Sequence, residues 1–479
     1  MNFASKALSI IFAFIPLTLL GYYVLRRREH KYRVLLAASW FFYVMLSPSP
    51  WFLGVILFTT VVDYFTGLLI ESAATPAAKR RWLWLSIVSN LGFLAAFKYT
   101  GFALANGLSL ARWLGFDVPD WVVNVVLPLG ISFHTFQGIS YTLDVYRGKL
   151  PAVRGFADFA LFVAFFPQLV AGPIVRAVEF LPQMKEPPRA SSQQVVEGLH
   201  WFILGLVKKG FLADWLTKFV DPVFHDPSAY DAVTLRWAVL AYAAQIYCDF
   251  SGYSDMAIGC AKWFGFELPQ NFNFPYLAGN IADFWRRWHI SLSTWMRDYV
   301  YISMGGNRRG SLRTYANLLL TMTLCGLWHG ASWNYVAWGL YNGVLLALHR
   351  LYDHGFGEGP WLARLRETWA FRFLAVVGTF ALVGAGWVML RAENWTAWWS
   401  IERAWLGGAG PAGTRWLPAW VPLLVGMVAL GHLFSGLRGL RCGLLDLPPL
   451  VRATAYVAAL VLLVAFGPGV TKAFIYFQF

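Results

Sequence analysis

Charged residues are scarce in this sequence. They make up 13% of the chain, against about 25% in an ordinary soluble domain, and hydrophobic residues make up 58%. This balance excludes a soluble globular domain. A helix that crosses a membrane needs about 20 mostly apolar residues, and runs of that kind recur along the chain. The composition therefore predicts an all-α protein that crosses a membrane many times.

Cysteine is rare as well. The four cysteines are Cys248, Cys260, Cys325 and Cys442, none forms a C-x-x-C pair, and most lie in or beside apolar runs. We expect reduced cysteines, no disulfide framework and no bound metal. The sequence also lacks a Walker A loop, an H-E-x-x-H motif and a G-x-S-x-G elbow. These absences argue against a P-loop NTPase, a zinc protease and a serine hydrolase.

Basic residues exceed acidic ones, 39 to 25, and they gather in short segments such as "RRREHKYR" and "AAKRR". Positive charge between apolar runs marks cytoplasmic loops, so we infer contact with membrane lipids and none with nucleic acid. The runs predict about twelve crossings. We expect one integral membrane domain over 1–479, in a cell inner membrane, with both termini extracytoplasmic. The stretch "FALFVAFFPQLVAGPIVR" carries Pro167 and Pro173 and predicts a re-entrant or broken helix.

The segment "FWRRWHISLSTWMRDYVYISMGGNRRG" predicts one amphipathic helix at the cytoplasmic interface. Its apolar stripe would contain Phe284, Trp288, Leu292, Trp295 and Tyr299. Its basic face would contain Arg286, Arg287 and Arg297, with His289 beside them. The arginines fit two roles equally: contact with anionic lipid headgroups, or binding of a phosphate-bearing donor.

An imidazole, His329, lies in the uncharged run "GLWHGASWNYVAWG". Ionisable groups at bilayer depth are functional candidates, and a neutral imidazole can act as a general base for a hydroxyl. The alternative is a histidine that only hydrogen-bonds between helices. Gly326 and Gly330 would let another backbone or a ligand come close to it.

Two further polar clusters interrupt apolar runs. In "QIYCDFSGYSDMAIG", Asp249 and Asp255 need partners, and a structural polar knot is the favoured interpretation. In "GISFHTFQGISYTLDVYRG", His134, Gln137 and Tyr141 share one helical face. A tunnel wall and a helix–helix hydrogen-bond seam explain this face equally well.

Six stretches together resemble the membrane-bound O-acyltransferase family, in its bacterial branch of alginate O-acetyltransferase membrane subunits. That branch also holds peptidoglycan and cellulose acetylation proteins and, more distantly, D-alanyl transfer proteins. The stretches are "FPQLVAGPIVR", "QIYCDFSGYSDMAIG", "NFNFPY", "DFWRRWHISLSTWMRDYVYISMGGNRRG", "NLLLTMTLCGLWHGASWNYVAWG" and "FIYFQF". They occur in this order, and the resemblance extends over nearly the whole chain.

The resemblance implies a ring of about 11–12 transmembrane helices, with re-entrant and interfacial helices, around a central tunnel. It implies transfer of an acetyl group from a cytoplasmic thioester to the outer face, where a separate polysaccharide acetyltransferase would use it. The donor would be acetyl-CoA or another acyl thioester, acting as co-substrate, with no bound cofactor. His329 matches the family's intramembrane histidine and His289 its second, cytoplasmic-side histidine. The acceptor glycan, whether alginate, peptidoglycan or cellulose, stays open.

The tail 467–479 is expected outside the membrane, and its aromatic residues suit an interfacial belt. Its motif also resembles the C-terminus of a small accessory protein of D-alanyl transfer, in which a tyrosine is proposed to carry the acyl group. Tyr476 would then relay acetyl with His329 as base. A transporter or channel with buried polar residues is the rival class, and a structural assembly protein is a third. Neither would release a free thiol from a thioester.

Overall fold

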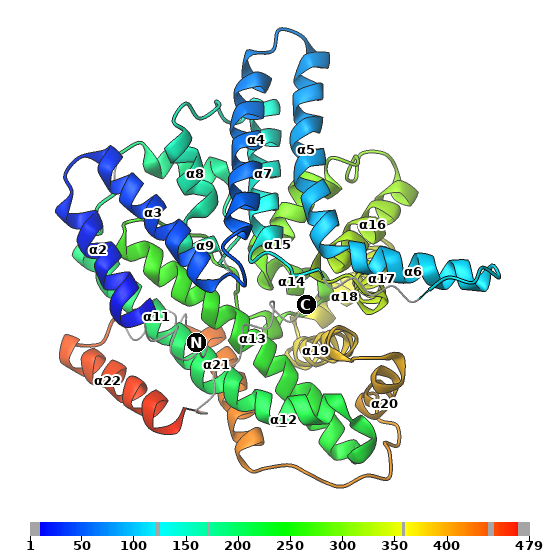
Figure 1. Ribbon diagram of the computed structural model, residues 1–479. Coiled ribbons are helices and arrows are strands. Elements are labelled where there is room, and N and C mark those ends of the chain that lie inside the picture. The colour runs from blue at the N-terminus through cyan, green and yellow to red at the C-terminus, as the bar shows by residue number, and fades with distance from the viewer. Residues whose placement is uncertain are drawn as a thin grey trace. The chain divides into compact units, whose positions relative to one another are not determined.

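The computed structural model describes residues 10–119, 125–169, 172–186, 188–356, 360–438 and 445–467 (Figure 1). Within these ranges the regular structure is helical, and the one β-contact is an isolated bridge between Tyr230 and Thr414. The all-α prediction is confirmed. The chain divides into two compact units, Met1–Leu199 with Ala257–Pro269, and His200–Met256 with Gln270–Phe479.

The first unit is built from the N-terminal helices. They are η1 (Ile10–Phe14), α2 (Ile15–Val24), α3 (Arg28–Leu46), α4 (Phe52–Ser72), α5 (Pro76–Lys98), α6 (Thr100–Trp113), α7 (Ile131–Tyr146), α8 (Phe156–Ala164), α9 (Phe166–Leu169), α10 (Ala177–Phe180) and η2 (Leu181–Met184). Two helices, α11 (Ser192–Leu206) and α13 (Ala232–Trp263), supply residues to both units.

Helices α4, α5 and α7 lie side by side in the first unit (Figure 1). A buried carboxylate joins two of them: Asp63 of α4 accepts hydrogen bonds from Ser86 Oγ at 2.6 Å and Asn90 Nδ2 at 2.8 Å, both on α5. Because a buried carboxylate is stable only when its oxygens are paired, this contact fixes the register of α4 and α5.

One expectation from the sequence concerns the segment that follows α8. The predicted break in the "FPQLVAGPIVR" segment is confirmed, because α8 ends at Ala164 and only the four-residue α9 follows. Helix α7 begins at Ile131, directly after Gly130, which takes a left-handed conformation (φ 66°). A Cβ at Gly130 would lie 2.4 Å from the carbonyl oxygen of Leu169, so the short α9 also requires glycine at this position.

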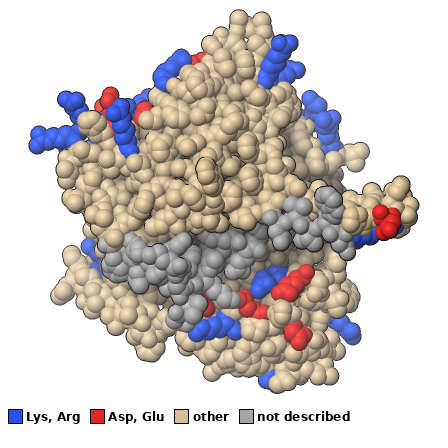
Figure 2. Space-filling model, viewed as in Figure 1, with Lys and Arg blue, Asp and Glu red and all other residues tan. Residues whose placement is uncertain are grey.

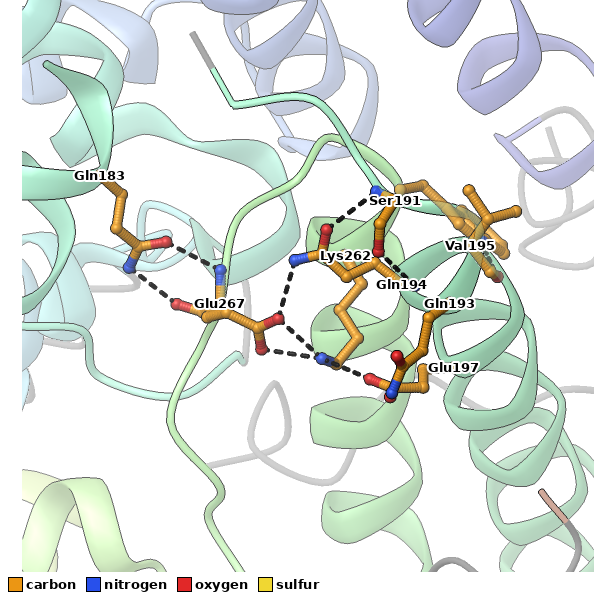
Figure 3. A network of polar contacts seen from close by, with 9 residues as sticks. Gln183, Ser191, Gln193, Gln194, Val195, Glu197, Lys262 and Glu267 are labelled. Atoms are coloured by element: carbon orange, nitrogen blue, oxygen red, sulfur yellow. Dashed lines mark hydrogen bonds and ion pairs between the residues drawn. The ribbon is translucent and has the colours of Figure 1, made fainter. Parts of the chain in front are cut away.

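A polar network closes the last turn of α13 within the first unit (Figure 3). Lys262 Nζ lies between two carboxylates, 3.0 Å from Glu197 and 2.8 Å from Glu267. The backbone of Glu267 is held in turn by Gln183, which accepts from its N–H at 2.9 Å and donates to its carbonyl at 3.1 Å. Burial lowers the pKa of Lys262, but the two carboxylates outweigh it and leave that pKa raised. Lys262 therefore stays charged and anchors the chain where α13 ends.

The second unit holds the remaining helices. They are η3 (Val207–Ala213), α12 (Asp214–His225), η4 (Pro227–Ala229), η5 (Pro275–Leu277), α14 (Ile281–Arg287), α15 (Ile290–Trp295), η6 (Met296–Tyr301), α16 (Ser311–His329), α17 (Trp333–Phe356), α18 (Pro360–Glu367), α19 (Trp369–Arg391), α20 (Trp395–Trp405), α21 (Trp420–Arg438) and α22 (Pro449–Phe466).

Helices α16 and α17 approach each other through glycine (Figure 1). A Cβ at Gly326 would lie 2.1 Å from the carbonyl oxygen of Tyr335, and one at Gly339 would lie 2.4 Å from that of Met322. A Cβ at Gly330 would enter the Tyr335 ring at 2.0 Å. The predicted close approach at Gly326 and Gly330 is confirmed, and what approaches is the chain's own α17.

Three described helices, α4, α19 and α22, are long and apolar enough to cross a membrane. A fourth span is formed if α5 and α6, which bend by 65° at their junction, are taken together. These are fewer than the twelve runs of the sequence, because several runs form shorter helices or carry buried polar residues. On the face drawn in Figure 2, the charged side chains form small separate groups on a surface that is mostly uncharged. The protein is an all-α membrane protein.

Candidate functional site

The predicted amphipathic helix around His289 is broken at the histidine. α14 ends at Arg287 and α15 begins at Ile290. His289 lies between them with φ 42° and ψ 56°, in the left-handed region. The single-helix interpretation was therefore wrong. The residues of its apolar stripe, Phe284, Trp288, Leu292, Trp295 and Tyr299, are each at most 6% exposed, because they pack within the protein.

A pair of backbone hydrogen bonds holds this break in place. The N–H of Ile290 donates to the carbonyl of Asn271 at 2.9 Å, and the N–H of Asn273 donates to the carbonyl of Arg287 at 2.9 Å. The Asn271 side chain adds a third tie, because its Oδ1 accepts from Ser291 Oγ at 2.6 Å. We call residues 271–274 and 287–291 the clamp. The clamp holds His289 in the left-handed conformation, which is unfavourable for a non-glycine residue by about 1–3 kcal/mol. Residues strained in this way are common at functional sites.

The second unit brings His289 and His329 together around one indole. The Trp328 ring centroid lies 6.2 Å from that of His289 and 4.9 Å from that of His329. Trp338 of α17 packs edge-on against His329 with centroids 5.0 Å apart, and Phe250 of α13 packs edge-on against His289 at 4.6 Å. The sequence predicted both histidines as site residues but gave no sign of these aromatic walls.

The surroundings favour neutral imidazole. His289 is fully buried and His329 is 6% exposed. Burial lowers the pKa of His289 well below its usual value, and the neighbouring His329 lowers that pKa further. A neutral imidazole keeps the lone pair that a general base needs, and the packed rings keep bulk water away.

The three predicted donor-binding arginines lie near this pair in sequence but are partly neutralised. Asp283 forms ion pairs with two of them, with carboxylate oxygens 3.7 Å from Arg286 and 2.9 Å from Arg287. Asp298 takes Arg297 at 2.6 Å. The side chains of Arg286 and Arg297 remain 70% and 61% exposed, so both can still meet an anion.

The predicted polar knot around Asp249 and Asp255 has its partners in the second unit. Lys208 Nζ lies 2.6 Å from Asp255, and Lys209 Nζ lies 2.5 Å from Asp249 and 2.9 Å from Asp214. The π-helical turn η3 carries both lysines. Sequence reasoning missed them, although a Lys-Lys pair inside the apolar run after Val195 was the available signal.

The remaining predicted site residues lie elsewhere. His134, Gln137 and Tyr141 are buried on one face of α7, in the first unit, and Tyr141 Oη accepts from the N–H of Val153 at 3.1 Å. Their role as a tunnel wall stays a prediction. Tyr476, with the rest of the tail beyond Gly467, and Cys442 lie outside the described residues. The other three cysteines are buried and free.

Comparison with known proteins places these features in a family. Residues 150–385 match the model of the membrane-bound O-acyltransferase family. The chain is 41% identical to the probable alginate O-acetylase of Pseudomonas aeruginosa, over 92% of this chain and 82% of that protein. It is 44% identical to the same enzyme of Azotobacter vinelandii, over 84% and 78%. It is 38% identical to the peptidoglycan O-acetyltransferase of Helicobacter pylori, over 80% and 76%. The chain belongs to the membrane-bound O-acyltransferase family and is an O-acyltransferase.

Proposed function

We propose that this enzyme takes an acetyl group from a cytoplasmic thioester, acetyl-CoA, and passes it across the inner membrane for O-acetylation of an extracytoplasmic polysaccharide. A separate extracytoplasmic acetyltransferase completes the reaction. The names of its relatives, an alginate O-acetylase and a peptidoglycan O-acetyltransferase, support a glycan as the final acceptor. No bound cofactor is needed.

One observation carries this proposal: two buried histidines flank one tryptophan, and the rings around them exclude water. Water must be kept out because it hydrolyses thioesters. A transporter, the rival class, would not release free CoA from the thioester.

The reaction assigns each histidine a role. His329 removes the proton of the acceptor hydroxyl, whose oxygen attacks the thioester carbonyl carbon. The carbon–sulfur bond then breaks, and the departing thiolate takes the proton from the His329 imidazolium. His289 lines the donor's approach to that carbon. The exposed guanidinium groups of Arg286 and Arg297, with Arg287, attract the donor's phosphates.

The test is turnover of acetyl-CoA by the purified protein, read as release of free CoA in the presence of acceptor glycan and the partner transferase. His329→Ala should lower the rate at least 100-fold, because removal of a general base removes about 10²–10⁴-fold of catalysis. His30→Ala, at an exposed position of α3, is the matched control and should behave as wild type. Normal turnover in His329→Ala, with the protein present in the membrane, would rule out the base.

The relay through Tyr476 is tested separately. Tyr476→Phe keeps the aromatic ring and removes only the hydroxyl. If the phenol carries acetyl, this variant loses glycan acetylation. If the tail is only an interfacial belt, acetylation continues at the wild-type rate.

A further inference from the structure

A third histidine of the second unit, His432 on α21, is buried without any role in the chemistry above. Its side chain is 4% exposed. Three rings surround it: Tyr247 of α13 with centroids 4.6 Å apart, Tyr276 of η5 stacked at 5.2 Å, and Phe274 edge-on at 5.9 Å. The apolar sequence around His432 gave no sign of this aromatic box.

The hydrogen bonds of His432 fix its tautomer. Its Nδ1 lies 2.9 Å from the carbonyl oxygen of Val428. A carbonyl only accepts, so Nδ1 must carry the proton, and in the neutral ring Nε2 is then a lone-pair acceptor. Among the residues that the structure describes, no group pairs with Nε2. A buried acceptor without a donor is unfavourable by about 1–3 kcal/mol, and native structures seldom keep one without a reason.

The clamp connects His432 to the histidine pair. Within the described chain, the two non-glycine residues with positive φ are His289 and Phe274, at φ 42° and 47°. The hydrogen bond from Asn273 to Arg287 ties their segments together. His289 therefore carries a candidate site imidazole, and Phe274 packs against His432. The rings of Tyr247, Phe272 and Phe250 continue the contact from His432 to His289, with successive centroids 5.8 and 5.1 Å apart.

The position of His432 along α21 indicates the cytoplasmic side. Helix α21 ends at Arg438, and the basic stretch that follows, "GLRCGLLDLPPLVR", is cytoplasmic by the distribution of positive charge. His432 lies in the half of α21 nearest that stretch. The molecule that enters from this side is the acyl donor, and its pantetheine arm offers two amide N–H groups between the phosphates and the thioester.

We propose that His432 is a positioning residue for the donor: its Nε2 accepts a hydrogen bond from a pantetheine amide N–H, and the aromatic box holds the amide plane. This inference rests on the proposed function, because it requires a pantetheine thioester as donor. The bond would set how far the arm enters and thus where the thioester carbonyl stops relative to His329. A neutral acceptor of this kind fits a neutral amide N–H.

Two substitutions separate the two ring nitrogens. His432→Asn can still donate to Val428 from the δ position but has no acceptor at the ε position. His432→Gln places an amide oxygen near the ε position. If His432 positions the donor, His432→Asn should bind acetyl-CoA about 3- to 10-fold more weakly with an unchanged melting temperature, and His432→Gln should recover part of the affinity. If the ring is only structural, affinity follows the melting temperature in both variants.

Affinity is best measured in the His329→Ala background, where the donor binds without turnover. The probes are acetyl-CoA and two analogues in which one pantetheine amide is an ester, which removes a single N–H. The protein with His432 intact should bind one of the two esters about 3- to 10-fold more weakly than acetyl-CoA. With that ester, His432→Asn should cause no further loss of affinity.

If the affinity losses caused by His432→Asn and by the ester simply add for both analogues, the role of His432 is overturned. It is also overturned if His432→Asn lowers acetylation while donor affinity is unchanged, because Nε2 would then serve the acceptor hydroxyl. Failure of the His329→Ala protein to bind acetyl-CoA at all would instead overturn the proposed function.

Discussion

At the scale of single residues, the site depends on backbone conformation as much as on side chains. His289 is a candidate site residue held in the left-handed region, where most L-residues are strained. The sequence places this histidine in a favourable helical pattern, so its backbone conformation could not be predicted. It arises from the hydrogen bonds of the clamp, whose partners are distant in the sequence.

The conformation of His289 allows its backbone role to be separated from its chemistry. Asn adopts the left-handed region readily, whereas Ala is destabilised there by about 1–2 kcal/mol. We expect His289→Asn to melt near the wild-type temperature and His289→Ala to melt lower. Both variants should lose acetyl-CoA turnover, because neither has an imidazole. Turnover in a well-folded His289→Asn protein would show that the imidazole is dispensable.

At the scale of elements, the contact between α16 and α17 places His329. Gly339→Ala would put a Cβ 2.4 Å from the Met322 carbonyl and 2.8 Å from the Thr323 Cα. Backbone atoms cannot rotate away as a flexible side chain can, so the helices must separate. We expect a loss of about 1–3 kcal/mol in stability, seen as a lower melting temperature in detergent.

Gly378→Ala on α19 is the control for this substitution, because nothing lies within 4 Å of its Cβ. It should be neutral or stabilise by about 0.5–1 kcal/mol, since alanine favours helix. If both substitutions lowered the melting temperature equally, the close contact of α16 and α17 would not be the cause of the destabilisation by Gly339→Ala.

The helices show what sequence patterns can predict. Apolar runs and proline breaks are local, so membrane-spanning helices and the interruption after α8 were correctly anticipated. His329 stood out as an imidazole in an apolar run, whereas His289 was singled out by the resemblance to the family, and the catalytic roles of both stay predictions. The lysine partners of Asp249 and Asp255, the break at His289 and the aromatic box of His432 depend on contacts between segments distant in the sequence, which periodicity does not encode.

At the scale of the whole molecule, the distribution of positive charge predicts an orientation. Arg80 lies in a segment expected in the cytoplasm, and Asp117 lies in one expected outside. Both are exposed. In intact cells, with Cys442 replaced by serine, a membrane-impermeant maleimide should label Asp117→Cys and leave Arg80→Cys unlabelled until the membrane is opened. The reverse pattern would place the donor entrance on the wrong side and contradict the proposed direction of transfer.

The glycine contacts of α16 and α17 bear on how saturation mutagenesis of this enzyme should be interpreted. Gly326, Gly330 and Gly339 leave no room for any side chain, so a scan would score almost every substitution there as inactive, as it would at His329. Inactivity alone would then assign chemistry to positions whose substitution acts through the packing of the two helices. A scan that also records the amount of folded protein separates the glycine positions from His329. Substitutions at the glycines would lower the amount of folded protein, whereas those at His329 would leave the protein abundant but inactive.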